Sequence, residues 1–496
     1  MLEAFVAGLL NVFTVPVLPL MLLGIAVGFA VGILPGIGSP VAMALMLPFV
    51  FGMKPTEAFA FLLGMYSVTS TTGDITSILF GVPGESISAA TIVDGHPMAK
   101  HGEAGRALGA ALMSSLVGAV VGAFTLAAAI PIVTPLVLSF ASPEFFALAL
   151  LGITFVAALS GGNRLKGLVA GGIGLVLAMV GLDPQEGIER YTFGQVALWE
   201  GLGLVPIVVG LFAIPEIIEL WMKGTSIAET RIGKLGGVWQ GIKDTFIHLG
   251  ITFRCSMIGT FIGIIPGLGG SVAQWVSYAH AVQSSPDQSR FGQGDVRGVL
   301  GPGAANNSGA GGALIPTIAF GVPGNLVMAI LLGAFIIQGV QPGPDMLTTN
   351  LPLTFSMVWV IVVANIVTVA ICLLFLNHLA KITYLRAALL IPILITLVYL
   401  GGYVDANSFL AMGLALLFGL IGMLMVYLDW PRPPLVLGLV LGPLVERYVF
   451  ISYRLYEFGF LLRPLVVLIL LIAAAVLFLP SLQRTGAKWR RVWRAG

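Results

Sequence analysis

Long apolar stretches dominate this chain and limit the folds that are open to it. Twelve of them lie between about residues 15 and 481, and most approach the roughly 20 apolar residues of a membrane-spanning helix. Only 9% of the 496 residues are charged, whereas about 25% is usual in a soluble domain. The apolar residues run continuously instead of alternating, which argues against an outer-membrane barrel. We predict an all-α polytopic membrane protein with about 10–13 helical segments in the lipid bilayer.

Five shorter apolar pieces are candidates for half-helices. They cover about 41–51, 73–82, 271–282, 313–322 and 435–445. At a rise of about 1.5 Å per residue, such pieces do not cross a hydrocarbon core of about 30 Å. The 64 glycines and 29 prolines include many in short groups. These groups mark the places where we expect helices to break.

Two glycine-rich motifs recur in the same order. GFAVGILPGIGSPVA at 28–42 resembles GTFIGIIPGLGGSVA at 259–273, and ILFGVPG at 78–84 resembles IAFGVPG at 318–324. The offsets are 231 and 240 residues, so we predict an internal duplication. The predicted parts are a first transmembrane repeat over 1–220, a basic cytoplasmic linker over 221–245, a second transmembrane repeat over 246–480 and a basic cytoplasmic tail over 481–496.

The basic residues favour opposite orientations for the two repeats. Lys and Arg concentrate in the short cytoplasmic loops of membrane proteins. The tail after Gln483 has five basic residues and no acidic one, and the linker has four basic and two acidic residues. The first repeat opens without a basic residue, whereas the second follows the basic linker directly. We therefore predict inverted-topology repeats with discontinuous helices and a cytoplasmic C-terminus, an arrangement typical of secondary transporters.

The PGxG motifs predict an anion site. Proline ends one helix, and the glycines let the next helix begin with unpaired N–H groups, which attract anions. Two inverted copies would direct two such helix N-termini toward a common centre. The predicted substrate-binding residues are Pro35, Gly36, Gly38 and Ser39 in the first copy, and Pro266, Gly267, Gly269 and Gly270 in the second. The alternative is that each motif only kinks a helix for packing.

Polar residues gather near these breaks in otherwise apolar surroundings. Polar groups inside a membrane must find partners within the protein. An intramembrane carboxylate normally pairs with or binds a cation, so Asp74 is the most informative of them. The ion-coupling candidates are Thr71, Thr72, Asp74, Ser77 and Thr317, with Asn306 and Asn307 in the same polar set. Na⁺ near Asp74 is the predicted metal, and neither a transition metal nor another cofactor is expected. Helix caps and interhelical hydrogen bonds are the alternative, and the role of Glu85 stays open.

Several long motifs resemble one known family. The PGxG pair, IVDGHPMAKHGEAGRALGAAL at 92–112 and GAANNSGAGGALIPTIAFGVPG at 303–324 look like the large permease subunit of the tripartite tricarboxylate transporters. The resemblance covers the full length and implies an importer of organic carboxylate anions in the bacterial inner membrane, coupled to Na⁺ with H⁺ as the alternative. It also implies a small four-helix membrane subunit and a periplasmic solute-binding protein as partners. It carries over to Pro35, Gly36, Gly38, Pro266, Gly267, Gly269, Asn306 and Asn307, whereas Asp74 departs from the small polar residue that the family pattern leads us to expect.

Other functional classes have less support in the sequence. The chain has no GxxxxGK[ST] motif for ATP hydrolysis and no HExxH or GxSxG motif for a hydrolase. We therefore predict that it is not an enzyme, with an intramembrane enzyme as the remote alternative. A stand-alone ion-coupled organic anion transporter is the nearer one. The net charge of +2 argues against a nucleic-acid partner. Inverted repeats permit both an elevator and a rocking-bundle motion.

Overall fold

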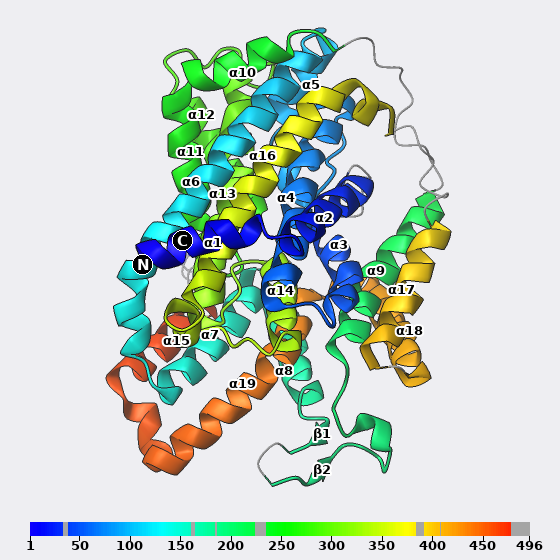
Figure 1. The fold of residues 1–496 in the computed structure, drawn as a ribbon, viewed down its shortest axis with the longest axis vertical. Helices are drawn as coiled ribbons and strands as arrows, with labels where there is room; N and C mark the ends of the chain where they lie inside the picture. Colours follow the sequence, from blue (N-terminus) through cyan, green and yellow to red (C-terminus); the bar gives the residue numbers. More distant parts are fainter. Residues whose placement is uncertain are drawn as a thin grey trace, which may run out of the picture. The chain divides into compact units, whose positions relative to one another are not determined.

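Helices form most of this computed structural model (Figure 1). The structure describes residues 1–32, 38–159, 164–183, 186–223, 235–382, 391–406 and 408–477. The one sheet within these ranges pairs β1 (Gly181–Leu182) and β2 (Glu189–Arg190) in antiparallel fashion. The all-α class predicted from the apolar stretches is confirmed.

The helices follow one another in this order along the chain. Those of the first half are α1 (Leu2–Val12), α2 (Val17–Gly32), α3 (Ser39–Met46), η1 (Leu47–Val50), α4 (Pro55–Phe80), η2 (Ser86–Ser88), α5 (Ile92–Lys100), α6 (Ala104–Leu138), α7 (Ser142–Leu159), α8 (Arg164–Leu177), η3 (Val196–Leu198) and α9 (Leu204–Lys223). Those of the second half are α10 (Val238–Ile247), α11 (Leu249–Ile264), α12 (Gly269–Gln283), α13 (Val296–Phe320), α14 (Leu326–Ile337), α15 (Pro344–Leu347), α16 (Leu351–Ile382), α17 (Ile391–Ala406), α18 (Phe409–Tyr427), α19 (Pro433–Tyr456) and η5 (Glu457–Leu462). A further apolar helix covers Pro464–Leu477.

Four of the described helical stretches are long and apolar enough to cross a membrane. They are α6, the Leu351–Leu376 part of α16, α18, and α19 together with η5. Two bent pairs raise the number to six if each pair forms one span: α1 with α2, bent by 65°, and α10 with α11, bent by 79°. This number of spans is that of a multi-pass membrane protein.

The same succession of helices occurs twice. A bent pair, a break, a short helix and a long polar helix follow one another in α1–α4 and again in α10–α13. α2 packs on α4, and α11 packs on α13. Gly28 of α2 meets Val68 of α4, and Gly259 of α11 meets Ser308 of α13. Gly28 and Gly259 are 231 residues apart, and Val68 and Ser308 are 240 residues apart. These are the offsets of the two repeated sequence motifs, which supports the duplication.

Larger side chains at these glycines should separate the paired helices. A Cβ at Gly28 would lie 2.8 Å from the Met65 carbonyl oxygen, and one at Gly259 would lie 2.7 Å from the Ala305 Cα. We expect Gly28→Val and Gly259→Val each to lower the free energy of unfolding by about 1–3 kcal/mol, measured by thermal unfolding in detergent. Gly172→Val on α8 is the control, because a Cβ there meets nothing within 4 Å. Equal melting temperatures in all three variants would contradict this packing.

The long helices α4 and α13 end in the same way. The residue after each is a glycine in the left-handed region, Gly81 with φ 68° and ψ 18°, and Gly321 with φ 67° and ψ 19°. Their N–H groups donate to the carbonyl oxygens of Ser77 and Thr317. Glycine adopts this conformation without the cost that a Cβ imposes. The breaks predicted at the two GVPG motifs are therefore confirmed as helix ends.

Three of the predicted half-helices are wrong. The pieces at 73–82 and 313–322 are the C-terminal parts of α4 and α13, and the piece at 435–445 belongs to α19. Hydroxyl-bearing residues lower the hydropathy upstream of residue 73 without ending the helix, because their side chains donate to carbonyls of the same helix. The pieces at 41–51 and 271–282 do form separate short helices, in α3 with η1 and in α12.

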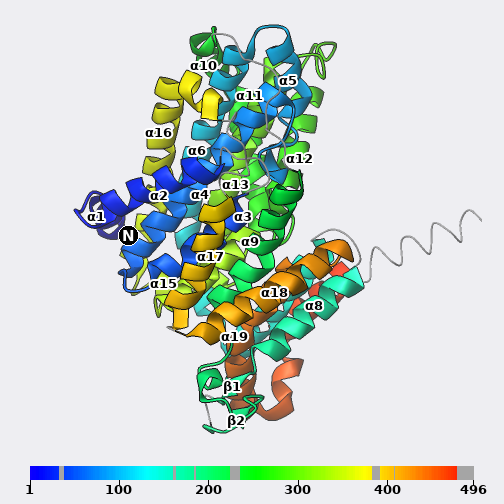
Figure 2. The same ribbon diagram turned by 90° about the vertical axis from the view of Figure 1, so that its right-hand side faces the viewer.

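Packing divides the chain into two compact units. The first comprises Met1–Thr134 and Val205–Met423, and the second comprises Pro135–Leu204 and Leu424–Gly496. In the second unit α8 lies beside α19 (Figure 2), and Arg190 donates to the Glu446 carboxylate. All the predicted site residues that the structure describes belong to the first unit. These packing units are not the two sequence repeats predicted at 1–220 and 246–480. The boundaries of those repeats stay a prediction.

Candidate functional site

The second PGxG motif forms a turn between two helices. α11 ends at Ile264 and α12 begins at Gly269, which confirms the predicted break. Gly267 has φ +80°, and its N–H donates to the Gly324 carbonyl oxygen at 3.0 Å. This bond ties the break to the second GVPG motif. The N-cap residue of α12, Leu268, makes no side-chain cap, and first-turn N–H groups without a cap can bind an anion. That an anion binds here stays a prediction.

The first PGxG motif is described from Gly38 onward, and Pro35 and Gly36 lie outside the described residues. α3 begins at Ser39, as predicted. The Ser39 hydroxyl donates to Glu85 Oε1 at 2.5 Å and lies 2.8 Å from Thr69 Oγ1. The Glu85 carboxylate therefore lies at the N-terminus of α3, where the helix dipole favours a negative charge.

One short segment contacts the starts of both helices. A Cβ at Gly38, next to α3, would lie 3.5 Å from Glu85 Cγ. A Cβ at Gly270, in the first turn of α12, would lie 3.0 Å from Ile87 Cγ2. α12 also packs on η2. The structure thus brings Gly38, Ser39 and Gly270 into contact with residues 85–88.

The two neighbouring asparagines connect α13 with α4 and α16. Asn306 Nδ2 donates to the Ser70 carbonyl oxygen at 2.7 Å. Asn307 Nδ2 donates to Thr71 Oγ1 at 2.8 Å and to Asn365 Oδ1 at 2.6 Å. All of these groups are buried. Sequence reasoning missed Asn365, although a single amide within the apolar stretch 353–376 was a signal that could have identified it.

The hydroxyl-bearing ion-coupling candidates are buried and donate to their own helices. Thr71, Thr72, Ser77 and Thr317 each donate to the carbonyl four residues earlier, at 2.6–2.9 Å. Such bonds satisfy the hydroxyl proton and leave the oxygen able to accept, as Thr71 Oγ1 does from Asn307 Nδ2 and Thr317 Oγ1 does from the Gly324 N–H. Their part in ion coupling stays a prediction.

Asp74 is a buried acid on α4. Its side chain is 1% exposed, and its Oδ1 accepts a hydrogen bond from Thr91 Oγ1 at 2.9 Å. The Asn306 side chain lies beside the same carboxylate, and Glu85 is the other acid that acts on it. Neither Asp74 Oδ2 nor Asn306 Oδ1 has a hydrogen-bond partner. Among the described residues, no ion pair to Asp74 is formed.

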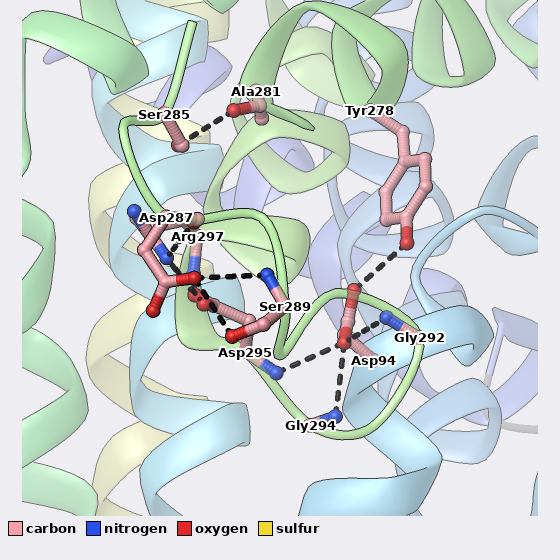
Figure 3. Close-up of polar contacts among 10 residues, drawn as sticks. All are labelled: Asp94, Tyr278, Ala281, Ser285, Asp287, Ser289, Gly292, Gly294, Asp295 and Arg297. Atoms are coloured by element: carbon pink, nitrogen blue, oxygen red, sulfur yellow. Dashed lines mark hydrogen bonds and ion pairs between the residues drawn. The ribbon is translucent and has the colours of Figure 1, made fainter. Parts of the chain in front are cut away.

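A second buried carboxylate fastens α5 to the loop before α13 (Figure 3). Asp94 is fully buried, and its Oδ1 accepts the backbone N–H groups of Gly292, Gly294 and Asp295 at 2.8–2.9 Å. Its Oδ2 accepts the Tyr278 hydroxyl at 3.0 Å. One carboxylate thus satisfies four donors from the second half of the chain, and this joins the two halves.

The same loop prepares the start of α13. Asp295 accepts the N–H of Arg297 at 2.9 Å and also pairs with its guanidinium at 2.6 Å. Burial alone would raise the pKa of the Asp295 carboxyl, but the hydrogen bonds and the charge of Arg297 hold that pKa below its usual value. The cap and the ion pair fix the direction in which α13 leaves the loop.

Comparison with known proteins supports the resemblance seen in the motifs. The profile of the family described as "Tripartite tricarboxylate transporter TctA family" matches residues 18–437. The "Uncharacterized 52.8 kDa protein in TAR-I ttuC' 3'region" of Agrobacterium vitis is 34% identical over 427 residues, which is 86% of this chain and 85% of the relative. The "Uncharacterized protein in TAR-II ttuC' 3'region" of the same organism is 31% identical over 191 residues, 38% of this chain and 79% of that protein. No solved structure matches significantly. The chain therefore belongs to the tripartite tricarboxylate transporter TctA family, a family of membrane transport proteins.

Proposed function

We propose that this protein is the large permease subunit of a binding-protein-dependent tripartite importer that carries organic carboxylate anions into the cell. Family membership supports the permease role and implies a small four-helix membrane subunit and a periplasmic solute-binding protein as partners. In this proposal the permease lies in the bacterial inner membrane, and its transport is coupled to Na⁺ or H⁺.

The observation that carries this proposal is the meeting of two helix N-termini at residues 85–88. At α3 the Glu85 carboxylate already accepts the Ser39 hydroxyl, whereas the N-cap residue of α12, Leu268, makes no side-chain cap. A helix N-terminus without a cap favours a carboxylate through its N–H groups and its dipole. We place the substrate carboxylate at the first turn of α12, next to Gly269 and Gly270.

An inverted arrangement of the repeats is part of the proposal. The repeated order of helices and the opposite charge bias of equivalent loops support it. Arg106 Nε of α6 donates to Asp244 Oδ2 of α10 at 2.6 Å, and α5 and α10 lie at the same end of the first unit (Figure 1). Lys100 of α5 and Lys243 of α10 therefore belong to one side, which we propose to be cytoplasmic.

Uptake by reconstituted vesicles tests this function. The full-length chain, its small membrane subunit and its binding protein are placed together in proteoliposomes, with labelled citrate as the probe tricarboxylate. We expect accumulation that needs a Na⁺ or pH gradient and needs no ATP. Accumulation that requires ATP without any ion gradient would refute the proposal. Omission of the binding protein tests the stand-alone alternative, in which uptake would be unchanged.

Replacement of the asparagines tests their place in the site. Asn306→Ala removes the bond to Ser70, and Asn307→Ala removes the bonds to Thr71 and Asn365. We expect each change to weaken the apparent affinity for citrate about tenfold, which corresponds to a loss of about 1.4 kcal/mol in substrate binding. Asn350→Ala, before α16, is the control. Unchanged affinity and ion dependence in both variants would remove the pair from the site.

A further inference from the structure

We propose that the coupling ion is a proton, which binds to Asp74 Oδ2 and is shared with Asn306 Oδ1. The inference rests on the proposed ion-coupled transport and adds the identity of the ion and the atoms that hold it. The carboxylate takes a proton from water on one side of the membrane and becomes a neutral acid. Its new O–H donates to the Asn306 carbonyl oxygen, and the proton leaves to water on the other side.

The hydrogen bonds around Asp74 and Asn306 leave one oxygen of each side chain able to accept. Asn306 Nδ2 donates to the Ser70 carbonyl oxygen at 2.7 Å. Only the nitrogen of an amide can donate, so this bond sets the orientation of the Asn306 side chain. Asp74 Oδ1 accepts a hydrogen bond from the Thr91 hydroxyl at 2.9 Å. Asp74 Oδ2 and Asn306 Oδ1 remain as buried acceptors without a partner, on side chains that are 1% and 5% exposed. One proton on the carboxylate satisfies both oxygens.

Among the described residues, no cation forms an ion pair with Asp74. Of the elements packed on α4, the helices α2, α3, α14 and η2 have no titratable side chain. The titratable groups elsewhere are Glu57 and Tyr66 on α4 itself, Asp94, His96 and Lys100 on α5, Arg297 on α13, and Cys372, His378 and Lys381 on α16. Arg297 is paired with Asp295, and His96 Nδ1 lies 3.2 Å from the Ile78 carbonyl oxygen. The charged group that acts on Asp74 is another acid, Glu85.

A proton suits this pair better than a metal cation does. A bare carboxylate without a counter-charge is costly to bury, and protonation removes that cost. Hard metal cations are held by larger sets of oxygen ligands, six or more for Ca²⁺, whereas two unpartnered acceptors match a single O–H. Protonation also removes one negative charge as the anionic substrate arrives. The loaded site therefore crosses the low-dielectric barrier with less net charge.

Infrared spectroscopy of the full-length protein in nanodiscs tests the inference without any substrate or partner. We expect a C=O stretch from a protonated carboxyl near neutral pH that is lost in Asp74→Asn and kept in Asp345→Asn, whose carboxylate is exposed on α15. The asparagine side chain can still donate to Asn306 Oδ1, so the variant keeps the neutral hydrogen bond. Asn306→Leu removes the acceptor, and the band should then shift to higher frequency. A spectrum of Asp74→Asn that keeps the whole band would overturn the proposal.

Transport by the assembled complex gives a second readout. Citrate entry into proteoliposomes that contain a pH-sensitive dye should acidify the interior of vesicles with the unmodified protein. In Asp74→Asn we expect the acidification to fall to the background level, and in Asp345→Asn we expect it to stay at the level of the unmodified protein. Acidification by Asp74→Asn equal to that of the unmodified protein, or entry of labelled sodium in place of protons, would overturn the proton site and leave the importer intact. Failure of the unmodified complex to take up citrate under every gradient would instead count against the proposed function, and the infrared result would still decide the proton site.

Discussion

Asp94→Ala should lower the free energy of unfolding by about 4 kcal/mol or more, because it leaves four donors without an acceptor. Three are the backbone N–H groups of residues 292, 294 and 295, and the fourth is the Tyr278 hydroxyl. A buried donor that loses its partner costs roughly 1–3 kcal/mol. The loop before α13 should open as a unit, since the Asp94 side chain accepts three of its backbone N–H groups. Chemical unfolding of the purified protein in detergent measures the loss.

A graded pair of variants separates the hydrogen bonds from the charge. Asp94→Asn keeps one carbonyl oxygen for the backbone donors but places an NH₂ group where the other oxygen was. We expect it to lose roughly half as much stability as Asp94→Ala, because hydrogen bonds to a charged group are about twice as strong as neutral ones. Asp345→Ala is the control, because its side chain is exposed. A wild-type unfolding midpoint in Asp94→Ala would show that the loop is held by other contacts.

Local sequence signals predicted much of the fold but not the length of the polar helices. The GVPG motifs end α4 and α13 because a glycine stands where the left-handed conformation is required, and that requirement is local. The continuity of α4 through Thr71 and Thr72 depends on hydroxyls that donate to carbonyls four residues earlier. A hydropathy profile does not include such hydrogen bonds. The polar residues in the middle of α4 therefore looked like the end of one helix and the start of another.

The site was predicted in its parts and not in its contacts. The residues before α3 and α12 were identified because proline and glycine reveal helix starts. The contact of Gly270 with Ile87, and that of Gly38 with Glu85, depend on the packing of segments from both halves. The hydrogen bonds of Asp94 come from a loop about 200 residues away in the sequence. Residue spacing along the chain therefore could not predict that Asp94 accepts three backbone N–H groups from that loop.

Gly267→Ala should reduce citrate uptake by roughly 5- to 30-fold while the fold is retained. Gly267 has φ +80°, a conformation that costs a residue with a Cβ about 1–2 kcal/mol. If the turn relaxes to avoid this cost, the N–H that donates to the Gly324 carbonyl at 3.0 Å moves, and the first turn of α12 moves with it. The fold-change is this cost converted at about 1.4 kcal/mol per tenfold. Uptake by proteoliposomes and thermal unfolding are measured side by side.

A matched glycine distinguishes a functional turn from general backbone strain. Gly102, after α5, has φ +82°, and a Cβ there meets nothing within 4 Å. Gly102→Ala therefore imposes the same conformational cost far from the break. If the turn at Gly267 positions the substrate site, both variants lose a similar amount of stability but only Gly267→Ala loses uptake. Equal uptake in the two variants would mean that the N-terminus of α12 does not hold the substrate, and the carboxylate site would then have to be sought elsewhere around residues 85–88.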